Sequence, residues 1–481
     1  MNLIQVHANH KSKLMAYSPI VFQVVSDLKN IVGKDFVFED ADNLKKYSHD
    51  ETEDLSYFPE IVVKPNTPEQ ISKILQLCNK EKITATPMGA RTGLSGGALP
   101  IYKGIAISME RFNKILFIDE NNLQATVEPG VVTQVFQEAV IEKGLFYPPD
   151  PSSRGSCSIG GNLAQCAGGP KAVKYGVTRD YILNLEVVLP TGEIIWTGAN
   201  VLKNSTGYNF THLMIGSEGT LGIITKVVFR LIPYPEKTLL MLAPFYSAEK
   251  ACEAVSAIFR AGIKPSALEF MERDAIDWVC KFEEISLKVE DNVQAHLLVE
   301  VDGNDGEVLM KECEIISDVF SNYGCGEILF AENEAQKAEL WKMRRKVAEA
   351  VKAHSVYKEE DTVVPRYELP RLLKSVKEIG KKYGFKSVCY GHAGDGNLHV
   401  NIIRGDLTDD VWNNTLNEGI KEIFQSVVNL GGTISGEHGI GLVQKDFITI
   451  AVDEKRMELM RGIKLLFDPN YILNPGKIFD R

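Results

Sequence analysis

Glycine-rich segments between Pro87 and Gly222 constrain the fold of this chain more than any other feature. The first of them, residues 87–98, holds four glycines in twelve residues, and further clusters follow at 158–162, 167–169, 207–209 and 216–222. Glycine lets the backbone approach a ligand closely, and successive N–H groups in such a loop bind anions. One such loop is equally compatible with a tight structural turn, but the repetition predicts a groove in which backbone touches an extended dinucleotide at several points.

The spacing of these glycines excludes two common nucleotide motifs. Residues 87–98 match neither Gly-x-Gly-x-x-Gly nor a phosphate-binding loop that ends in Gly-Lys-Ser/Thr. Residues 148–153 add a rigid Pro-Pro-Asp-Pro-Ser-Ser turn that carries an acid and two hydroxyls. The dinucleotide groove therefore lacks a nicotinamide fingerprint.

Composition bounds the class of protein. The chain has 481 residues, 44% of them hydrophobic, which is enough apolar material for about two to four domains. A formal net charge of −11 gives no overall basic surface for nucleic acid and does not favour attraction to anionic lipid. No apolar run approaches the roughly 18 residues of a transmembrane helix, and residues 1–30 lack the order of a secretory signal. We therefore expect a soluble cytoplasmic protein, with Met15 as a second candidate start.

The pattern of apolar residues predicts an N-terminal helical segment over 1–55 and two globular parts, 56–233 and 234–481. In the first part, a strand at 61–63, a helix at 68–79 and a strand at 84–87 lead into the first glycine cluster. Short strands are predicted at 104–108, 124–127 and 185–189, the last of them followed by a hairpin-like turn. The second part alternates helices at 250–260 and 334–353 with strands at 295–301 and 387–390.

Three of the nine histidines lie in two short motifs of the second part. The first motif, residues 391–401, has an Asp-Gly-Asn turn between two strand-like runs, which predicts a hairpin that brings His392 and His399 toward each other. Along the second strand, the period of two places His399 and Asn401 on one face, opposite the apolar residues. Two imidazoles and an amide are thus predicted to converge.

The second motif, residues 432–441, places Glu437 and His438 side by side in a glycine-rich turn. Two histidines and one carboxylate form a ligand set that suits zinc, iron(II) or manganese and leaves positions open for substrate. A lone histidine is more often a buried, hydrogen-bonded residue, and spacing alone does not link the two motifs. The eight cysteines form no Cys-x-x-Cys pair, which argues against an iron–sulfur cluster or a four-cysteine zinc site.

From about Pro59 to Pro233 the glycine segments, in order, resemble the FAD-binding domain of the vanillyl-alcohol oxidase and p-cresol methylhydroxylase (PCMH) superfamily. The resemblance implies an α+β fold: a PCMH-type FAD-binding domain of two subdomains, then a C-terminal domain whose antiparallel sheet is flanked by helices. Loop 89–93 would wrap the pyrophosphate, 149–153 and 160–162 would line the flavin, and Glu218 with 223–224 would lie near the adenine and ribose. The implied cofactor-binding residues are Pro87, Gly89, Ala90, Arg91, Thr92, Gly93, Pro149, Asp150, Ser153, Gly160, Gly161, Asn162, Glu218, Ile223, Ile224 and Asn474.

Some members of this superfamily attach FAD covalently through a histidine or cysteine. No histidine lies between His49 and His212, so we expect non-covalent FAD. Cys157 and Cys166 are the only nearby nucleophiles, and buried packing is the role expected of them.

Residues 236–481 resemble the C-terminal domain of the FAD-linked 2-hydroxy-acid dehydrogenases, which include D-lactate dehydrogenases, glycolate oxidase catalytic subunits and D-2-hydroxyglutarate dehydrogenases. The shared motifs are His-x-Gly-Asp-Gly-Asn-x-His at 392–399, Gly-Glu-His-Gly at 436–439 and Asn-Pro-Gly-Lys at 474–477. The resemblance implies that His392, His399 and Glu437 hold a divalent metal, with zinc as the first candidate. It also implies that His438 takes the hydroxyl proton, that Asn401 faces the substrate, and that the α-hydrogen leaves as hydride to FAD.

The same resemblance bears on the substrate. Arg344 matches the arginine of a Trp-x-x-Arg motif that contacts the substrate carboxylate, whereas a solvated surface arginine is its generic interpretation. Lys358 matches a lysine that helps to hold the distal carboxylate in the hydroxyglutarate branch. Ala348 stands where that branch has a threonine, which favours D-lactate or another small D-2-hydroxy acid. The acidic run at 359–361 follows the family pattern and is equally typical of a solvated charge cluster.

Other functions are compatible with the sequence. D-2-hydroxyglutarate and glycolate are alternative substrates, and an ether-lipid synthase would use FAD without net oxidation. A flavin-binding assembly subunit is the non-enzyme alternative, but it could lose Glu437 and His438 freely, and this chain keeps both. We expect a quinone, a cytochrome or an electron-transfer flavoprotein as electron acceptor in place of NAD, an acceptor through which the protein could sit at the membrane periphery. A homodimer is also compatible.

Overall fold

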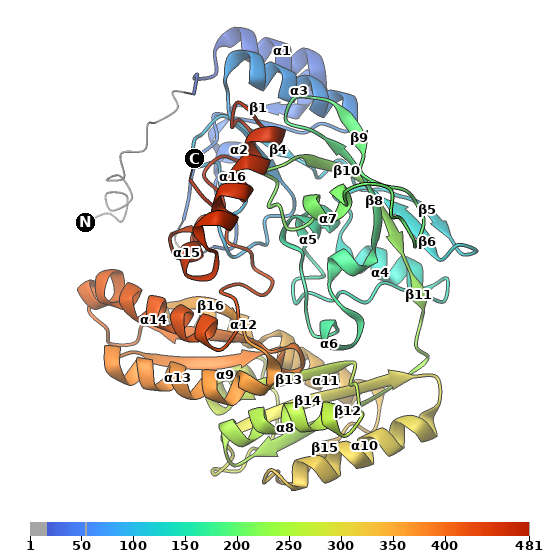
Figure 1. The fold of residues 1–481 in the computed structure, drawn as a ribbon, viewed down its shortest axis with the longest axis vertical. Helices are drawn as coiled ribbons and strands as arrows, with labels where there is room; N and C mark the ends of the chain where they lie inside the picture. The colour runs from blue at the N-terminus through green and yellow to red at the C-terminus, as the bar shows by residue number, and fades with distance from the viewer. Residues whose placement is uncertain (1–16, 53–54, 481) are drawn as a thin grey trace.

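The computed structural model describes residues 17–52 and 55–480, with the first half of the chain above the second in the view of Figure 1. The upper part begins with a four-stranded sheet in the order β1-β2-β4-β3, in which only β1 is antiparallel to its neighbour. The strands are β1 Val37–Phe38, β2 Ile61–Val63, β3 Ala85–Met88 and β4 Ile105–Ser108. The N-terminal segment therefore supplies a strand as well as helices α1 (Phe22–Val32) and α2 (Ala41–Lys46).

Helix α3 (Pro68–Glu81) packs on this sheet and matches the helix predicted at 68–79. Its start is fixed by Thr67, whose side chain accepts a hydrogen bond from the backbone N–H of Gln70, and by proline in the first turn. The stripe that it buries with α1 against β2, β3 and β4 consists of Ile71, Ile74, Leu75, Leu77 and Cys78.

A second subdomain is built around an antiparallel sheet in the order β5-β6-β10-β8-β9. Its strands are β5 Ile115–Asp119, β6 Gln124–Val127, β8 Ile182–Val188, β9 Ile194–Trp196 and β10 Ile223–Arg230. Around it lie α4 Thr133–Ile141, α5 Ile159–Gln165, α6 Ala172–Tyr175, α7 Phe210–Met214 and the short pair β7 Leu145–Phe146 and β11 Ile232–Pro233. The glycine clusters lie after β3, in the first turn of α5, just after α5, just before α7, and between α7 and β10, so all but the one in α5 fall in connections between elements.

The lower part is a seven-stranded antiparallel sheet in the order β15-β12-β14-β13-β17-β18-β16. Its strands are β12 Lys237–Phe245, β13 Ala267–Glu272, β14 Ala295–Gly303, β15 Leu329–Phe330, β16 Tyr357–Val363, β17 Lys386–Gly391 and β18 Asn397–Ile403. One face packs on α8 Ala248–Arg260, α10 Gly306–Ser321, α13 Leu369–Tyr383 and α14 Leu416–Asn429. The other packs on α9 Arg273–Phe282, α11 Glu334–Arg345 and α12 Val347–His354. The expected α+β class, with helices on an antiparallel sheet, is confirmed.

The single long helix predicted at 334–353 is wrong. The chain breaks it at Lys346, whose backbone leaves helical geometry at ψ 3°, into α11 and α12. The two arginines that precede the break pair with carboxylates in different parts of the molecule. Arg344 is buried against Glu269 of β13, and Arg345 reaches Asp150 in the upper part.

The end of the chain returns to the upper part (Figure 1). After α15 (Ile448–Ala451), helix α16 (Glu454–Phe467) buries Lys464, which donates hydrogen bonds to Asp468 and to the backbone carbonyl of Thr220. Leu473 bridges to Ala85 of β3. The split near residue 233 thus describes the path of the chain, while α16 and the residues after it complete the packing of the first half.

Two expectations concern membrane-spanning helices and the start of the chain. Within residues 17–52 and 55–480, no helix combines the length and the apolar character needed to cross a membrane. The two candidate start residues, Met1 and Met15, lie outside the described residues.

Candidate active site

A cavity of about 710 Å³ runs between the two parts of the molecule, within the usual size range of ligand pockets. The predicted cofactor-binding residues that line it are Pro87, Gly89, Ala90, Arg91, Thr92, Gly93, Ser153, Gly160, Gly161, Asn162, Glu218, Ile223 and Ile224. A Cβ added to Gly93 would have no atom within 4 Å, so this backbone borders open space. At the other end the same cavity is lined by His399, Glu437 and His438.

Three of the predicted cofactor residues do not line this cavity. Pro149 only offers its carbonyl to Gln137, and Asp150 is buried in an ion pair with Arg345, whose Nη2 lies 2.5 Å from its Oδ2. Asn474 donates from its amide to the carbonyls of Gly97 and Glu218 at 3.0 and 2.9 Å. Asp150 and Asn474 therefore support the walls of the cavity from behind.

Glu218 ties the glycine segment 216–222 to the second histidine motif. Its carboxylate accepts hydrogen bonds from the backbone N–H groups of Ile440 and Gly441 at 2.8 and 2.7 Å. Burial raises the pKa of Glu218 to about 7. Gly441 has a φ of +53°, and a Cβ there would lie 2.1 Å from the carbonyl oxygen of Ser95. The turn is thus held against the first glycine cluster as well.

The hairpin predicted at 391–401 is confirmed. β17 and β18 pair antiparallel, with Tyr390 opposite His399. The connection closes through Gly396, which has a φ of +87° and whose Cβ would lie 1.9 Å from the carbonyl oxygen of Val364, so only glycine fits. The apolar residues of β18 join the core on one face, and His399 and Asn401 face the other way.

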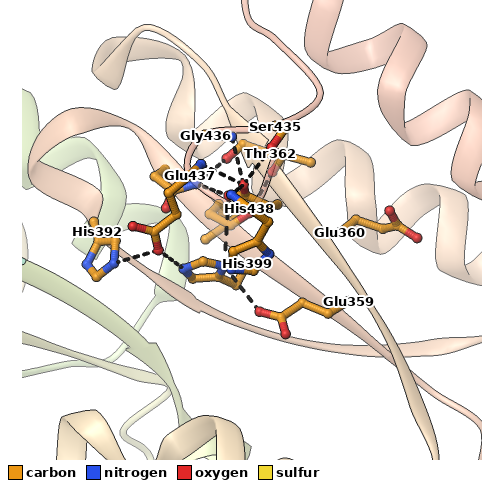
Figure 2. Close-up of polar contacts among 12 residues, drawn as sticks. Glu359, Glu360, Thr362, His392, His399, Ser435, Gly436, Glu437 and His438 are labelled. Carbon is orange, nitrogen blue, oxygen red and sulfur yellow. Dashed lines mark hydrogen bonds and ion pairs between the residues drawn. The ribbon is translucent and has the colours of Figure 1, made fainter. Parts of the chain in front are cut away.

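Glu437 lies between the two hairpin histidines (Figure 2). Its Oε1 is 3.3 Å from Nε2 of His392 and 3.5 Å from Nε2 of His399. Ligand atoms about 2.0–2.1 Å from a tetrahedral zinc ion are separated from each other by about 3.3 Å. The structure therefore brings together the three side chains that were linked only by resemblance, at spacings that fit a small divalent cation.

His392 is fixed from behind by a buried carboxylate. Its Nδ1 lies 2.7 Å from Oε2 of Glu269, and the same oxygen pairs with Arg344 at 2.7 Å. Burial would lower the pKa of His392, but the carboxylates of Glu269 and Glu437 raise it. A carboxylate on the far nitrogen is the partner that metal-binding histidines commonly have, because it fixes the ring and its tautomer.

Asp361 builds the turn that carries Glu437 and His438. Its Oδ2 accepts hydrogen bonds from the backbone N–H groups of Gly436, Glu437 and His438 at 2.8–2.9 Å and from the hydroxyl of Ser435. Burial alone would raise the pKa of Asp361, but the His438 and His399 rings and these N–H groups hold it well below its usual range. One carboxylate thus orients both functional residues of the second motif.

His438 stacks on His399, with ring centroids 5.2 Å apart. Burial would lower the pKa of His438, but the carboxylates of Asp361, Glu359 and Glu437 raise it. Glu359 reaches the same group, with Oε1 3.2 Å from Nδ1 of His399 (Figure 2). Burial would raise the pKa of Glu359, but the neighbouring His399 and His438 lower it below its usual value.

The predicted substrate-binding residues have three different placements. Arg344 lines the cavity and is buried, so a solvated surface arginine is excluded, and its Nε has no hydrogen-bond partner among the described residues. Asn401 is fully buried beside the cavity, also with no partner for its amide in the described part of the chain. Lys358 is not brought to the cavity: its Nζ donates to the carbonyl of Trp412 at 3.1 Å. Successive residues of β16 face opposite sides, which turns Glu359 inward instead.

Sequence reasoning missed Glu269, Asp361 and Tyr390 as parts of the site. Asp361 belongs to the acidic run at 359–361, a pattern that is equally typical of a solvated charge cluster. Glu269 and Tyr390 stand in ordinary strand sequences and carry no local signal. They reach the site through the pairing of β13 with β17, in which Phe270 lies opposite Gly391.

Asp361→Asn is expected to lower the free energy of unfolding by about 2–4 kcal/mol at pH 7, because it leaves several buried N–H groups with a weaker acceptor. The pKa of Asp361 is depressed in the folded protein, so its contribution is present above the unfolded-chain value of about 4 and is lost as the pH falls through the lower folded value. Thermal unfolding of both proteins at pH 7 and at lower pH tests this. Equal unfolding temperatures at pH 7 would contradict it.

Comparison with known protein families supports the same division of the chain. Residues 59–198 match the family described as FAD binding domain, and residues 234–478 match FAD linked oxidases, C-terminal domain. Among solved structures, p-cresol methylhydroxylase has a TM-score of 0.78 at 18% identity, covering 95% of this chain and 96% of that one. Alkyldihydroxyacetonephosphate synthase has a TM-score of 0.74 at 19% identity, covering 96% and 87%. At these identities the likeness concerns the fold alone.

Curated relatives are more similar in sequence. A D-lactate dehydrogenase of Anaerostipes hadrus is 37% identical over 468 residues, 96% of this chain and 98% of that protein. Glycolate oxidase subunit GlcD of Bacillus subtilis is 38% identical over 90% of this chain and 92% of its own length. A D-2-hydroxyglutarate dehydrogenase of Stutzerimonas stutzeri is 32% identical over 95% and 98%.

Proposed function

The chain belongs to the FAD-linked oxidases, and from that membership we propose that it is a dehydrogenase that oxidises a small D-2-hydroxy acid, with D-lactate as the leading substrate, to the 2-oxo acid. The observation that carries the proposal is one cavity that joins the glycine segments to the histidine motifs. Glu437 lies against the glycine cluster 167–169, where a Cβ on Gly168 would meet its Oε2 at 3.0 Å. Groups for binding a dinucleotide and groups for proton transfer therefore border the same space.

The residues present fit both bound groups that the proposal requires. FAD would occupy the part of the cavity between 87–98, 152–162 and 216–224, held without a covalent bond, and when bound it supplies the acceptor for a hydride. A divalent cation, zinc before iron or manganese, would be held by His392, His399 and Glu437. When bound it supplies positive charge that favours the ionised hydroxyl of the substrate.

The residues of the chain itself divide the remaining work. His438, at the cavity wall beside Glu437, would accept the proton of the substrate hydroxyl, while Asp361 holds the turn that positions it. Arg344 would bind the substrate carboxylate through its unpartnered Nε–H. Asn401, whose buried amide also lacks a partner among the described residues, would orient the substrate from the sheet.

Further properties follow as parts of the same proposal. A quinone, a cytochrome or an electron-transfer flavoprotein would take the electrons from the flavin, since no nicotinamide fingerprint is present in the sequence. The alternative substrates, glycolate and D-2-hydroxyglutarate, correspond to the names of two of the relatives. We propose a cytoplasmic location, with membrane contact only through the acceptor.

A panel of D- and L-2-hydroxy acids tests the proposal. The purified FAD-loaded protein, mixed anaerobically with D-lactate, is expected to lose its flavin absorbance within one turnover, and L-lactate is expected to bleach it far more slowly. Absorbance spectra and assay of pyruvate measure the reaction. A protein that retains FAD but is bleached by no 2-hydroxy acid would contradict the proposal and favour a non-redox synthase or a flavin-binding assembly subunit.

A further inference from the structure

A negative charge lines the substrate end of the cavity where a lysine was expected. Strands β16, β17 and β18 contribute four residues to the cavity wall: Tyr357, Glu359, Tyr390 and His399. This wall contains one carboxylate and neither lysine nor arginine. Lys358, one residue away, is on the opposite face, with its ammonium 5.2 Å from the ring of Trp412. Figure 2 shows Glu359 directed toward His399.

Glu359 is held at this position by its surroundings. It lies opposite Asn401 in the pairing of β16 with β18, and its Oε1 is 3.2 Å from Nδ1 of His399. Asn401 and Tyr390 have buried polar atoms with no hydrogen-bond partner among the described residues. A ligand group next to these residues would therefore meet neutral donors and acceptors together with one carboxylate.

The segment of α11 and α12, which packs beside this wall, does not compensate for the charge of Glu359. Four cations from the segment of α11 and α12 line the cavity, and each has a carboxylate partner. Arg344 pairs with Glu269, Arg345 with Asp150, Lys346 with Glu349 and Lys352 with Glu51. Ala348 on the same segment adds only a methyl group to the lining. In the proposed function Arg344 binds the α-carboxylate, so a second carboxylate would face Glu359 with no further cation on this segment or on the sheet wall that lacks a carboxylate partner.

We infer that Glu359 is a specificity-determining residue that excludes 2-hydroxy acids with a second carboxylate and restricts the enzyme to monocarboxylates with a neutral side chain. The inference rests on the proposed function, because it concerns the substrate of the same site. Like charges brought together in a desolvated site repel strongly, so one carboxylate can discriminate between substrates that otherwise share the reacting atoms. Glycolate and D-lactate both satisfy this condition, and D-2-hydroxyglutarate does not.

The test compares Glu359→Gln with Glu360→Gln in the FAD-loaded protein. Glu360 is a matched control, because it is the adjacent buried carboxylate and its side chain turns away to accept from Gln444 at 2.8 Å. For each protein, kcat/KM is measured for D-lactate and D-2-hydroxyglutarate. Glu359→Gln is expected to raise the ratio of hydroxyglutarate to lactate at least about tenfold, whereas Glu360→Gln leaves the ratio unchanged. Glu359 contacts His399, so its substitution is also expected to lower activity toward both substrates. A loss common to both substrates cancels in the ratio.

Binding of pyruvate and 2-oxoglutarate, followed by the change in flavin absorbance, gives a readout that does not require turnover. The wild type is expected to bind pyruvate more tightly, and Glu359→Gln to reduce the difference. Equal binding of both oxo acids by the wild type, or ratios that Glu359→Gln leaves within twofold, would overturn the inference. Failure of the proposed function is distinct, since it would be seen as no bleaching by any 2-hydroxy acid.

Discussion

His438→Ala is expected to lower kcat for D-lactate by about 10²- to 10⁴-fold, the range that a positioned general base contributes. The side chain lies at the cavity wall, and Asp361 fixes its backbone through the N–H group of His438 at 2.9 Å. Removal of the imidazole takes away the base proposed for the hydroxyl proton, and the neighbouring His399 belongs to the proposed metal set. The rate of flavin reduction in anaerobic stopped-flow experiments measures the effect directly.

The control for this variant is His354→Ala. His354 is an exposed histidine that stacks on Trp278, with ring centroids 3.8 Å apart, and it is not among the residues that line the cavity. Its removal should leave flavin reduction unchanged. Near-normal reduction by His438→Ala, with FAD and metal contents equal to those of the wild type, would exclude the role of His438 as the base.

Local patterns predicted the parts of the fold that depend on neighbouring residues. The amphipathic pattern correctly predicted that α3 begins at Pro68, and the Asp-Gly-Asn turn correctly predicted the hairpin of β17 and β18. The alternation along β18 correctly placed His399 and Asn401 on the face away from the core. In each case the decisive interactions lie within a few residues of one another, so their pattern is visible in the sequence.

The contacts that complete the site join distant residues and leave no such pattern. Glu269 and His392 are 123 positions apart and meet because β13 pairs with β17. Asp150 was expected at the cofactor, but its partner is Arg345, 195 positions away. The sequence also does not show which side chains of β16 face the cavity. Alternation along a strand places Lys358 and Glu359 on opposite faces, but only the register with β18 decides which of them faces inward.

Removal of the divalent metal is expected to abolish oxidation of D-lactate while FAD stays bound, because the residues proposed to hold the metal are distinct from those proposed to bind FAD. Glu437→Gln should reproduce this loss, since it removes the only carboxylate of the set formed with His392 and His399. We expect its metal affinity to fall by more than about 100-fold. Glu269→Gln, which changes only the partner behind His392, should lose a smaller 10- to 100-fold.

The graded response separates a metal site from a histidine–carboxylate cluster that has only a structural role. If a cation binds, inductively coupled plasma mass spectrometry should show a larger loss of metal in Glu437→Gln than in Glu269→Gln. Adding zinc, iron(II) or manganese to chelated wild type should restore its activity with one of these ions. If the cluster is only a set of ion pairs, chelation has no effect on turnover, and wild type and Glu437→Gln contain equally little metal. That result would remove the metal from the proposed reaction without affecting the role of His438, which is tested separately by its own variant.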